Sequence, residues 1–293
     1  MTTAVMVHPG TANETLTRWV RRSGLSRNRQ GLLGVGITLL FVLVAVFADV
    51  FAPYSWEDMR PEISLQPPSA QHLVGTDEFG RDVLSRVLYG ARISLMVCII
   101  SVTICSILGL GLGLAAGYFG GWVDLVVMRV VDALFAFPVV LLAIAVVAVL
   151  GPGLENATIA LGVIFTPAYA RVTRAAALMV MQEQYVEAAR SIGAPTTRIM
   201  RRELLPNMMP ALIVQTTLLF AIAIVVEAGL SFIGLGAQPP QPSWGTMLRT
   251  GRDFLEIAPW LAIAPGVAIF VSVLGLNLVG DWLRDFLDPR LKI

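Results

Sequence analysis

The sequence predicts an all-α membrane protein that crosses the bilayer six times. Of its 293 residues, 56% are hydrophobic and 14% are charged, whereas soluble domains carry roughly 25% charged residues. So much apolar surface needs lipid as its solvent. Apolar runs that could cross the roughly 30 Å hydrocarbon core recur along the chain, although the fourth is short. These runs cover residues 31–52, 93–116, 134–150, 157–169, 211–230 and 260–280.

The apolar runs divide the chain into three parts. Residues 1–30 are predicted to form a cytoplasmic tail, and residues 31–90 to form the first transmembrane helix and a polar external segment. Residues 91–293 are predicted to form a five-helix core that contains a cytoplasmic loop. Trp260 and Trp282 bracket the last run, which is typical of aromatic anchors at membrane interfaces.

The basic residues indicate the orientation of the chain. Six spans place both termini on one side, and the cytoplasmic side is the one richer in Lys and Arg. Of the 21 basic residues, 15 fall in segments that share a side with the N-terminus, and six fall opposite. Both termini and the loop at 175–206 are therefore predicted to be cytoplasmic.

The composition argues against several kinds of chemistry. The single lysine, Lys292, has no Gly-rich loop before it, so the chain lacks a standard P-loop for ATP. His8 and His72 are isolated and suggest no metal site. Cys98 and Cys105 would lie about 10 Å apart along a helix, too far for a disulfide, and are predicted to be packing residues. A net charge of +1 gives no sign of a nucleic-acid partner.

The second run carries a ridge of small residues. Gly109, Gly113 and Gly117 recur at four-residue intervals, and small residues at this spacing let two membrane helices approach closely. We expect this ridge to pack against another helix, and the alternative is a moving hinge.

An arginine-rich segment at 175–206 separates two apolar runs. Helix-forming residues at 175–192 carry their apolar side chains close to one face, which predicts a helix. Gly193 is suited to end that helix by adopting a positive φ, and Pro195 is suited to begin a second helix. The apolar face consists of Leu178, Met181, Tyr185, Ala188, Ala189 and Ile192.

These features predict a helical elbow. The second helix is expected to run to about Leu205, and Pro206 is expected to open the next span. The small side chains of Ala188 and Ala189 are predicted to lie at the inner corner. A compact elbow of this kind could sit in a groove of a partner protein, whereas the alternative is a basic loop that contacts anionic lipid.

The spacing inside the elbow resembles the EAA signature of importer permeases. Three residues separate the EAA triplet from a glycine, and a Leu-Pro pair follows further along. In this chain the signature comprises Glu187, Ala188, Ala189, Gly193, Leu205 and Pro206. One position departs from the family pattern, because Glu203 stands where a hydrophobic residue is usual.

The resemblance continues outside the elbow. Four further segments, in the same order, resemble the C-type permease subunit of dipeptide and oligopeptide ABC importers, and the similarity covers about residues 30–293. Nickel importers use similar permeases, so a nickel importer is the alternative within the family. The four segments are residues 75–95, 117–138, 227–248 and 280–292.

The resemblance implies a fold, a set of partners and a coupling site. The fold is that of a type I ABC importer permease, also called MetI-like, in a bacterial cytoplasmic membrane. The partners are a second, homologous permease that completes a heterodimer, two ATPase domains or subunits, an external binding protein and a peptide substrate. The chain itself would bind no cofactor or metal and would not be an enzyme, because ATP and Mg²⁺ are used by the ATPases. The implied coupling residues are Tyr185, Glu187, Ala188, Ala189, Gly193, Leu205 and Pro206.

Four residues are candidates for an outer gate or cap. The charges of Asp77, Arg81 and Asp82, together with Arg86, could pair and cap a helix on the outer face, or they could contact substrate. Glu227 lies toward the outer end of the fifth run, where an ionisable group is costly and so usually faces protein or water. It could brace a gate, contact a substrate amino group or couple protons.

Two other classes of function fit the sequence less well. An ion-coupled secondary transporter marks its pathway with intramembrane charges and broken, repeated helices, whereas acids in the middle of these runs are nearly absent. A membrane-embedded enzyme would need catalytic residues, and neither a nucleophile–base arrangement nor a metal-ligand cluster is visible.

Overall fold

The structure is a computed structural model that describes residues 29–287. Within that range the chain is helical, and its one extended pairing is an isolated bridge between Thr76 and Asp82. A 3₁₀ turn, η1, and a π-helix, η2, accompany the α-helices. The elements are α2 (Arg29–Val46), α3 (Ala48–Phe51), η1 (Pro61–Ile63), α4 (Val83–Phe119), α5 (Gly121–Phe135), α6 (Val139–Leu150), α7 (Leu154–Val180), α8 (Gln184–Ser191), α9 (Thr196–Arg198), η2 (Ile199–Leu204), α10 (Leu205–Phe232), α11 (Trp244–Asp253) and α12 (Trp260–Leu287).

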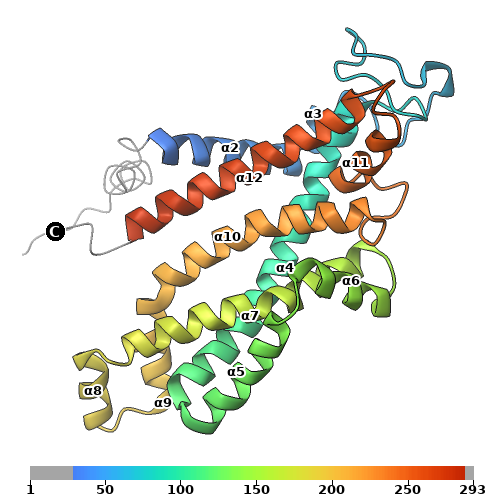
Figure 1. Ribbon diagram of the computed structural model, residues 1–293. Coiled ribbons are helices and arrows are strands. Elements are labelled where there is room, and N and C mark those ends of the chain that lie inside the picture. The colour runs from blue at the N-terminus through green and yellow to red at the C-terminus, as the bar shows by residue number, and fades with distance from the viewer. Residues whose placement is uncertain (1–28, 288–293) are drawn as a thin grey trace, which may run out of the picture.

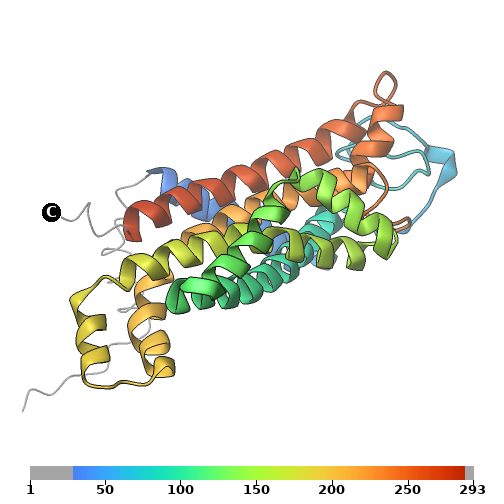
Figure 2. The same ribbon diagram turned by 60° about the horizontal axis from the view of Figure 1, so that its bottom comes forward.

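The helices form an elongated bundle with two distinct ends (Figures 1 and 2). The polar segment between α3 and α4 lies with α11 at one end, which we call the cap end. Helices α8 and α9 project at the other end, which we call the elbow end. The start of α2 and the end of α12 both point toward the elbow end (Figure 1). Residues 1–28 of the expected tail, and residues 288–293 including Lys292, lie outside the described residues.

Length and composition identify fewer membrane-spanning helices than the six expected. In the described part of the chain, four helices are long and apolar enough to cross a membrane: α2, α4, α12 and the continuous helix Thr196–Phe232. The bent pair of α5 and α6 would make a fifth span. The expected span at 134–150 is broken, because α5 and α6 meet at an angle of 93°. Pro138 lies in this break, where it lacks an N–H and disfavours helix in the residue before it.

The expected fourth span lies within α7, which is 27 residues long. Helix α7 is not apolar enough to be identified as a span by length and composition. It carries two arginines, Arg171 and Arg174, toward the elbow end. The domain boundary predicted at residue 90 falls inside α4, which runs without a break for 37 residues.

The glycine ridge is a helix-packing surface, as predicted. A Cβ added at Gly113 would lie 2.4 Å from the carbonyl oxygen of Ala170 on α7. A Cβ added at Gly109 or Gly117 would lie 2.6 Å from a side chain of α7. Helices α4 and α7 therefore approach so closely that these three positions admit no side chain without a shift.

Helices α2 and α12 also pack through glycine. A Cβ at Gly31 would lie 2.6 Å from the ring of Trp282, which is buried. Trp282 thus packs between two helices rather than facing a membrane interface as expected. Trp260, at the cap end, donates from Nε1 to the carbonyl of Thr76 at 3.2 Å. The two cysteines are free and buried, which confirms that they are packing residues.

Candidate functional site

The elbow has one more bend than the sequence predicts. The expected helix at 175–192 is interrupted, because α7 ends at Val180 and α8 begins only at Gln184. Glu183, the residue before α8, has an extended backbone with φ −76° and ψ 139°. Neither glycine nor proline occurs in the break, so the sequence carries no local signal for it.

The turn after α8 forms as predicted. Gly193 has φ +73°. Its N–H donates to the carbonyl of Arg190 at 3.0 Å, and the N–H of Ala194 donates to the carbonyl of Ala189 at 3.1 Å. These two bonds define a Schellman motif, in which a left-handed residue closes the end of a helix. Gly193 is therefore the residue that turns the chain from α8 toward α9.

The buried face of α8 differs from the predicted one. Val186 is fully buried and Ala189 is half-buried, whereas Ala188 is exposed. Tyr185 and Ile192 are exposed as well. The interruption before Gln184 explains this difference, since a helical period counted from 175 no longer applies beyond it. The inner corner consists of Val186 and Ala189, and Ala188 lies on the outer surface of the elbow.

The second arm runs directly into the membrane helix. Helix α9 continues as the π-helix η2, whose buried residues are Ile199 and Leu204. Helix α10 then begins at Leu205, with Pro206 in its first turn. The π-helix, which has a wider turn than an α-helix, was not predicted; such segments occur frequently at functional sites.

The elbow is held to the end of α4 by one aromatic side chain. The hydroxyl of Tyr118 donates to Oγ1 of Thr196 at 3.3 Å, and the guanidinium of Arg190 lies 5.5 Å from the centre of the Tyr118 ring. Partial desolvation raises the pKa of the exposed Tyr185, and the carboxylates of Glu183 and Glu203 raise it further. Glu203, which departs from the family pattern, is thus near Tyr185 in this elbow.

The surface of the elbow is suited to protein contact. Glu187 and Ala188 are exposed on the outer side of α8, and no side chain of the described residues covers them. A short helix that presents a small residue at its centre allows a partner's backbone or side chains to approach closely. This arrangement can fill a groove in another protein.

At the cap end, Asp77 organises a buried network. Its carboxylate accepts from the backbone N–H groups of Phe79 and Arg81, each at 2.9 Å. The same carboxylate contacts Nε of Arg81 at 2.6 Å and Nε of Arg86 at 3.5 Å. All three charged side chains are buried. The structure therefore brings Asp77, Arg81 and Arg86 together, as the sequence predicts.

Asp82 is the N-cap of α4. It accepts from the backbone N–H of Ser85 at 2.8 Å, and a side-chain cap of this kind satisfies one of the free N–H groups at a helix start. Its other oxygen lies 2.9 Å from Nδ1 of His72. His72, which is isolated in the sequence, is thus a buried partner of this cap.

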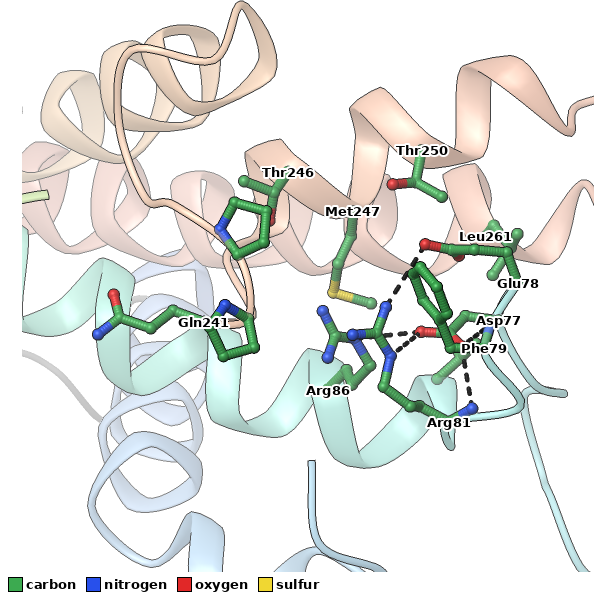
Figure 3. A pocket seen from close by; sticks show the side chains of 13 residues that line it. Asp77, Glu78, Phe79, Arg81, Arg86, Gln241, Thr246, Met247, Thr250 and Leu261 are labelled. Carbon is green, nitrogen blue, oxygen red and sulfur yellow. Dashed lines mark hydrogen bonds and ion pairs between the residues drawn. The ribbon is translucent and has the colours of Figure 1, made fainter. Parts of the chain in front are cut away.

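A small cavity of about 100 Å³ adjoins the cap network. Figure 3 shows Arg81 and Arg86 pointing into it, with Met247 of α11 opposite. Glu78 also lines this cavity, and burial raises its pKa, with a further increase from the neighbouring Asp77. The cap segment and α11 therefore meet across a cavity lined by both charged and apolar side chains. The cavity lies between two parts of the chain that are far apart in sequence.

Glu227 belongs to a separate cluster. Its side chain is fully buried and accepts from Oγ of Ser231 at 2.8 Å and from Oγ of Ser94 at 3.4 Å. Oγ of Ser231 in turn accepts from the N–H of Ala237, at 3.0 Å. Glu227 thereby links α10 to α4 and to the loop before α11. Within residues 29–287, neither a hydrogen bond nor an ion pair joins this cluster to Asp77, Arg81 or Asp82.

Family comparisons match both halves of the chain. Residues 109–293 match the family described as binding-protein-dependent transport system inner membrane component. Residues 18–68 match the family described as the N-terminal TM domain of oligopeptide transport permease C.

Several curated proteins are similar over most of their length. The dipeptide transport system permease protein DppC of Alkalihalophilus pseudofirmus is 45% identical over 92% of this chain and 88% of that protein. The di/tripeptide transport system permease protein DppC of Pseudomonas aeruginosa is 48% identical over 91% of this chain and 90% of that protein. The glutathione transport system permease protein GsiD of Pectobacterium atrosepticum is 46% identical over 87% and 85%, respectively.

A solved structure shares the fold. A chain of the MetNI methionine ABC transporter, in an inward-facing conformation, aligns with a TM-score of 0.57 at 22% sequence identity. The alignment covers 69% of this chain and 96% of that chain. At this level of identity, the likeness concerns the fold alone.

Proposed function

Because the chain belongs to the family of binding-protein-dependent transport system inner membrane components, we propose that it is a permease subunit of an ABC importer for dipeptides and short oligopeptides. It forms half of the translocation pathway and couples that pathway to separate ATPase subunits. The similarity to dipeptide, di/tripeptide and glutathione permeases supports a peptide substrate.

The elbow is the observation that carries the coupling role. It projects at the end opposite the cap (Figure 1), is closed by the Schellman turn at Gly193, and leads without interruption into α10. In this proposal an ATPase receives the exposed surface around Ala188. Movement of the ATPase pair then shifts α10 as a rigid-body step of alternating access.

The remaining parts of the machine are supplied by other chains. A homologous permease forms a heterodimer with this one, two ATPase domains bind ATP and Mg²⁺, and an external binding protein delivers the peptide. The chain itself contributes no cofactor and catalyses no reaction. It lies in the bacterial cytoplasmic membrane, with both termini and the elbow in the cytoplasm.

The cap residues serve a structural role in this proposal. Asp77, Arg81 and Asp82 are buried rather than open to solvent. Arg81 donates to Asp77, and Asp82 accepts from the N–H of Ser85. These bonds support a cap that orders the outer segment. Glu227 braces the loop before α11 through Ser231. The proposal divides the chain into a tail at 1–30, an outer unit at 31–90 and a core at 91–293, with α4 crossing the boundary at residue 90.

Thiol labelling tests the orientation. Single cysteines replace Gln66, Gln241 or Thr197 in a background without Cys98 and Cys105, and intact cells receive an impermeant thiol reagent. The cysteines at 66 and 241 are expected to react and the one at 197 is not. Labelling at 197 from outside would contradict the proposed orientation.

An uptake assay tests the transport function. A strain without this chain is compared with the complemented strain for uptake of labelled dipeptides, tripeptides, longer peptides and Ni²⁺. Loss of peptide uptake alone supports the proposal, whereas loss of Ni²⁺ uptake alone would assign the chain to a nickel importer.

Elbow substitutions test coupling. Ala188→Arg places a large cation on an exposed position, so the chain is expected to fold and pair with its sister permease but to release the ATPases. Thr197→Arg, at another exposed position of the elbow, is the matched control. If both variants retain the ATPases equally, the proposed docking role of Ala188 is contradicted.

A further inference from the structure

A polar pocket lies between α5 and α7 near the elbow end. It has a volume of about 500 Å³, within the range of roughly 300–1,000 Å³ that is usual for small-molecule sites. Three arginines and two aspartates line it, together with two apolar residues. The charged residues are Asp124, Arg129 and Asp132 from α5 and Arg171 and Arg174 from α7.

Two of the arginines are already paired. Arg174 donates from Nε and Nη2 to the two oxygens of Asp124, a bidentate geometry that holds the carboxylate in place. Arg171 donates to Asp132 at 2.6 Å, and its guanidinium lies 3.9 Å from the centre of the Phe135 ring.

The third arginine is different. Arg129 is exposed and has no acidic partner among the residues that the structure describes. With three arginines and two aspartates, the pocket carries a formal charge of +1. A guanidinium that has no acidic partner and lines a pocket is free to bind a carboxylate, which its fork of N–H donors matches.

The pocket is not covered by the rest of this chain. Along α5, Val131 is the buried residue, and the paired side chains Arg171 and Asp132 are 46% and 55% exposed. Ionised groups on this scale cannot face lipid tails at low cost. The pocket therefore opens toward water or toward the space between permease subunits.

Resting on the proposed function, we propose that this pocket contacts the transported peptide and that Arg129 binds its free α-carboxylate. A peptide with free ends carries both charges, and its carboxylate matches Arg129. Its ammonium group matches Asp132, which lies one turn away on the same face of α5 and whose bond to Arg171 uses Oδ1. Because Arg129 is the unpaired group, the pocket is expected to discriminate between peptides by whether their C-terminal carboxylate is free.

An anionic lipid headgroup is the competing ligand. The two aspartates disfavour it, because a phosphate brings only negative charge to a pocket whose rim already holds two carboxylates. A zwitterionic peptide finds both partners there. The charge arrangement thus favours a peptide over a lipid phosphate.

The test uses the complete transporter in vesicles, with one binding protein throughout. Uptake of dialanine is compared with uptake of dialanine amide, which lacks the carboxylate charge. Each variant is normalised to the wild type for each peptide. Arg129→Gln is expected to lower uptake of the free acid by about tenfold, the effect of one charge-assisted hydrogen bond, and to change amide uptake little. Arg129→Lys should keep the preference for the free acid.

Arg284→Gln is the matched control, because Arg284 is likewise exposed near the elbow end but lies on α12. Normal co-purification of Arg129→Gln with the partner subunits confirms its assembly. Equal loss of both peptides, or no loss of either, overturns the role of Arg129. A loss that appears only in vesicles containing phosphatidylglycerol assigns the pocket to lipid phosphate and also overturns it. If the wild type imports neither peptide, the proposed function itself fails.

Discussion

Replacing Gly193 by valine tests the turn that shapes the elbow. At φ +73° the backbone lies in the left-handed region, which β-branched residues adopt poorly. A Cβ at this position would meet no atom within 4 Å. The Cβ itself meets no clash, so the substitution is expected to act chiefly through backbone strain.

The size of the effect follows from the conformation. A left-handed residue other than glycine costs roughly 1–2 kcal/mol, and a cost near the middle of this range, about 1.4 kcal/mol, is expected for valine. Since 1.4 kcal/mol corresponds to a factor of ten, the fraction of molecules with a closed turn falls by about tenfold against open forms. Apparent affinity for a partner that needs the closed turn falls in proportion to the fraction of closed molecules, and thus by up to the same factor.

The assay is ATPase co-purification and substrate-stimulated ATP hydrolysis. Gly193→Asn is the control, because asparagine enters the left-handed region far more readily than valine. We expect the valine variant to lose up to about nine-tenths of its apparent ATPase affinity and the asparagine variant to lose little. Thermal unfolding of the isolated permease should change only slightly in both, since Gly193 is exposed. Wild-type ATPase binding by the valine variant would refute the reasoning.

Three further predictions concern the rest of the chain. Gly113→Ala should destabilise the fold by about 1–3 kcal/mol, because its Cβ would lie 2.4 Å from the carbonyl of Ala170, whereas Gly111→Ala has open space and should be neutral in the same denaturation assay. Glu227→Gln should retain ATP-driven uptake in vesicles without a proton gradient; if a gradient alone drives uptake and this variant abolishes it, proton coupling is the better interpretation. Because the pKa of Glu78 is raised by folding, its stabilising contribution is present below its ordinary pKa and is lost as the pH rises through the raised value. Glu78→Gln should therefore raise Tm above that of the wild type near neutral pH and leave it unchanged in acid. If variant and wild type have the same Tm at both pH values, the raised pKa of Glu78 is contradicted.

Features with a local chemical signal could be predicted from the sequence. The ridge of Gly109, Gly113 and Gly117 follows the helical repeat, so its packing role is visible without a structure. Gly193 follows a run of helix formers, and glycine is the usual residue for such a turn. The charge pair of Asp77 and Arg81 lies four residues apart, within the reach of side chains in a tight segment.

Features set by distant parts of the chain could not be predicted in this way. The break before α8 contains neither glycine nor proline, and it shifts the helical phase so that Val186, not Ala188, becomes buried. His72 meets Asp82 across an irregular segment without periodicity. The pairs of Asp124 with Arg174 and Asp132 with Arg171 join helices 50 and 39 residues apart in sequence, a relation that no local pattern contains.

Helix α4 gives the molecule a lever. Asp82 caps its first turn at one end, and Tyr118 contacts the elbow at the other. Its 37 residues span about 55 Å at 1.5 Å per residue. A tilt of about ten degrees around its midpoint would carry the two ends roughly 5 Å in opposite directions. Through this one rod, a displacement of the elbow in one direction becomes a displacement of the cap in the other, with α7 carried along by the glycine ridge.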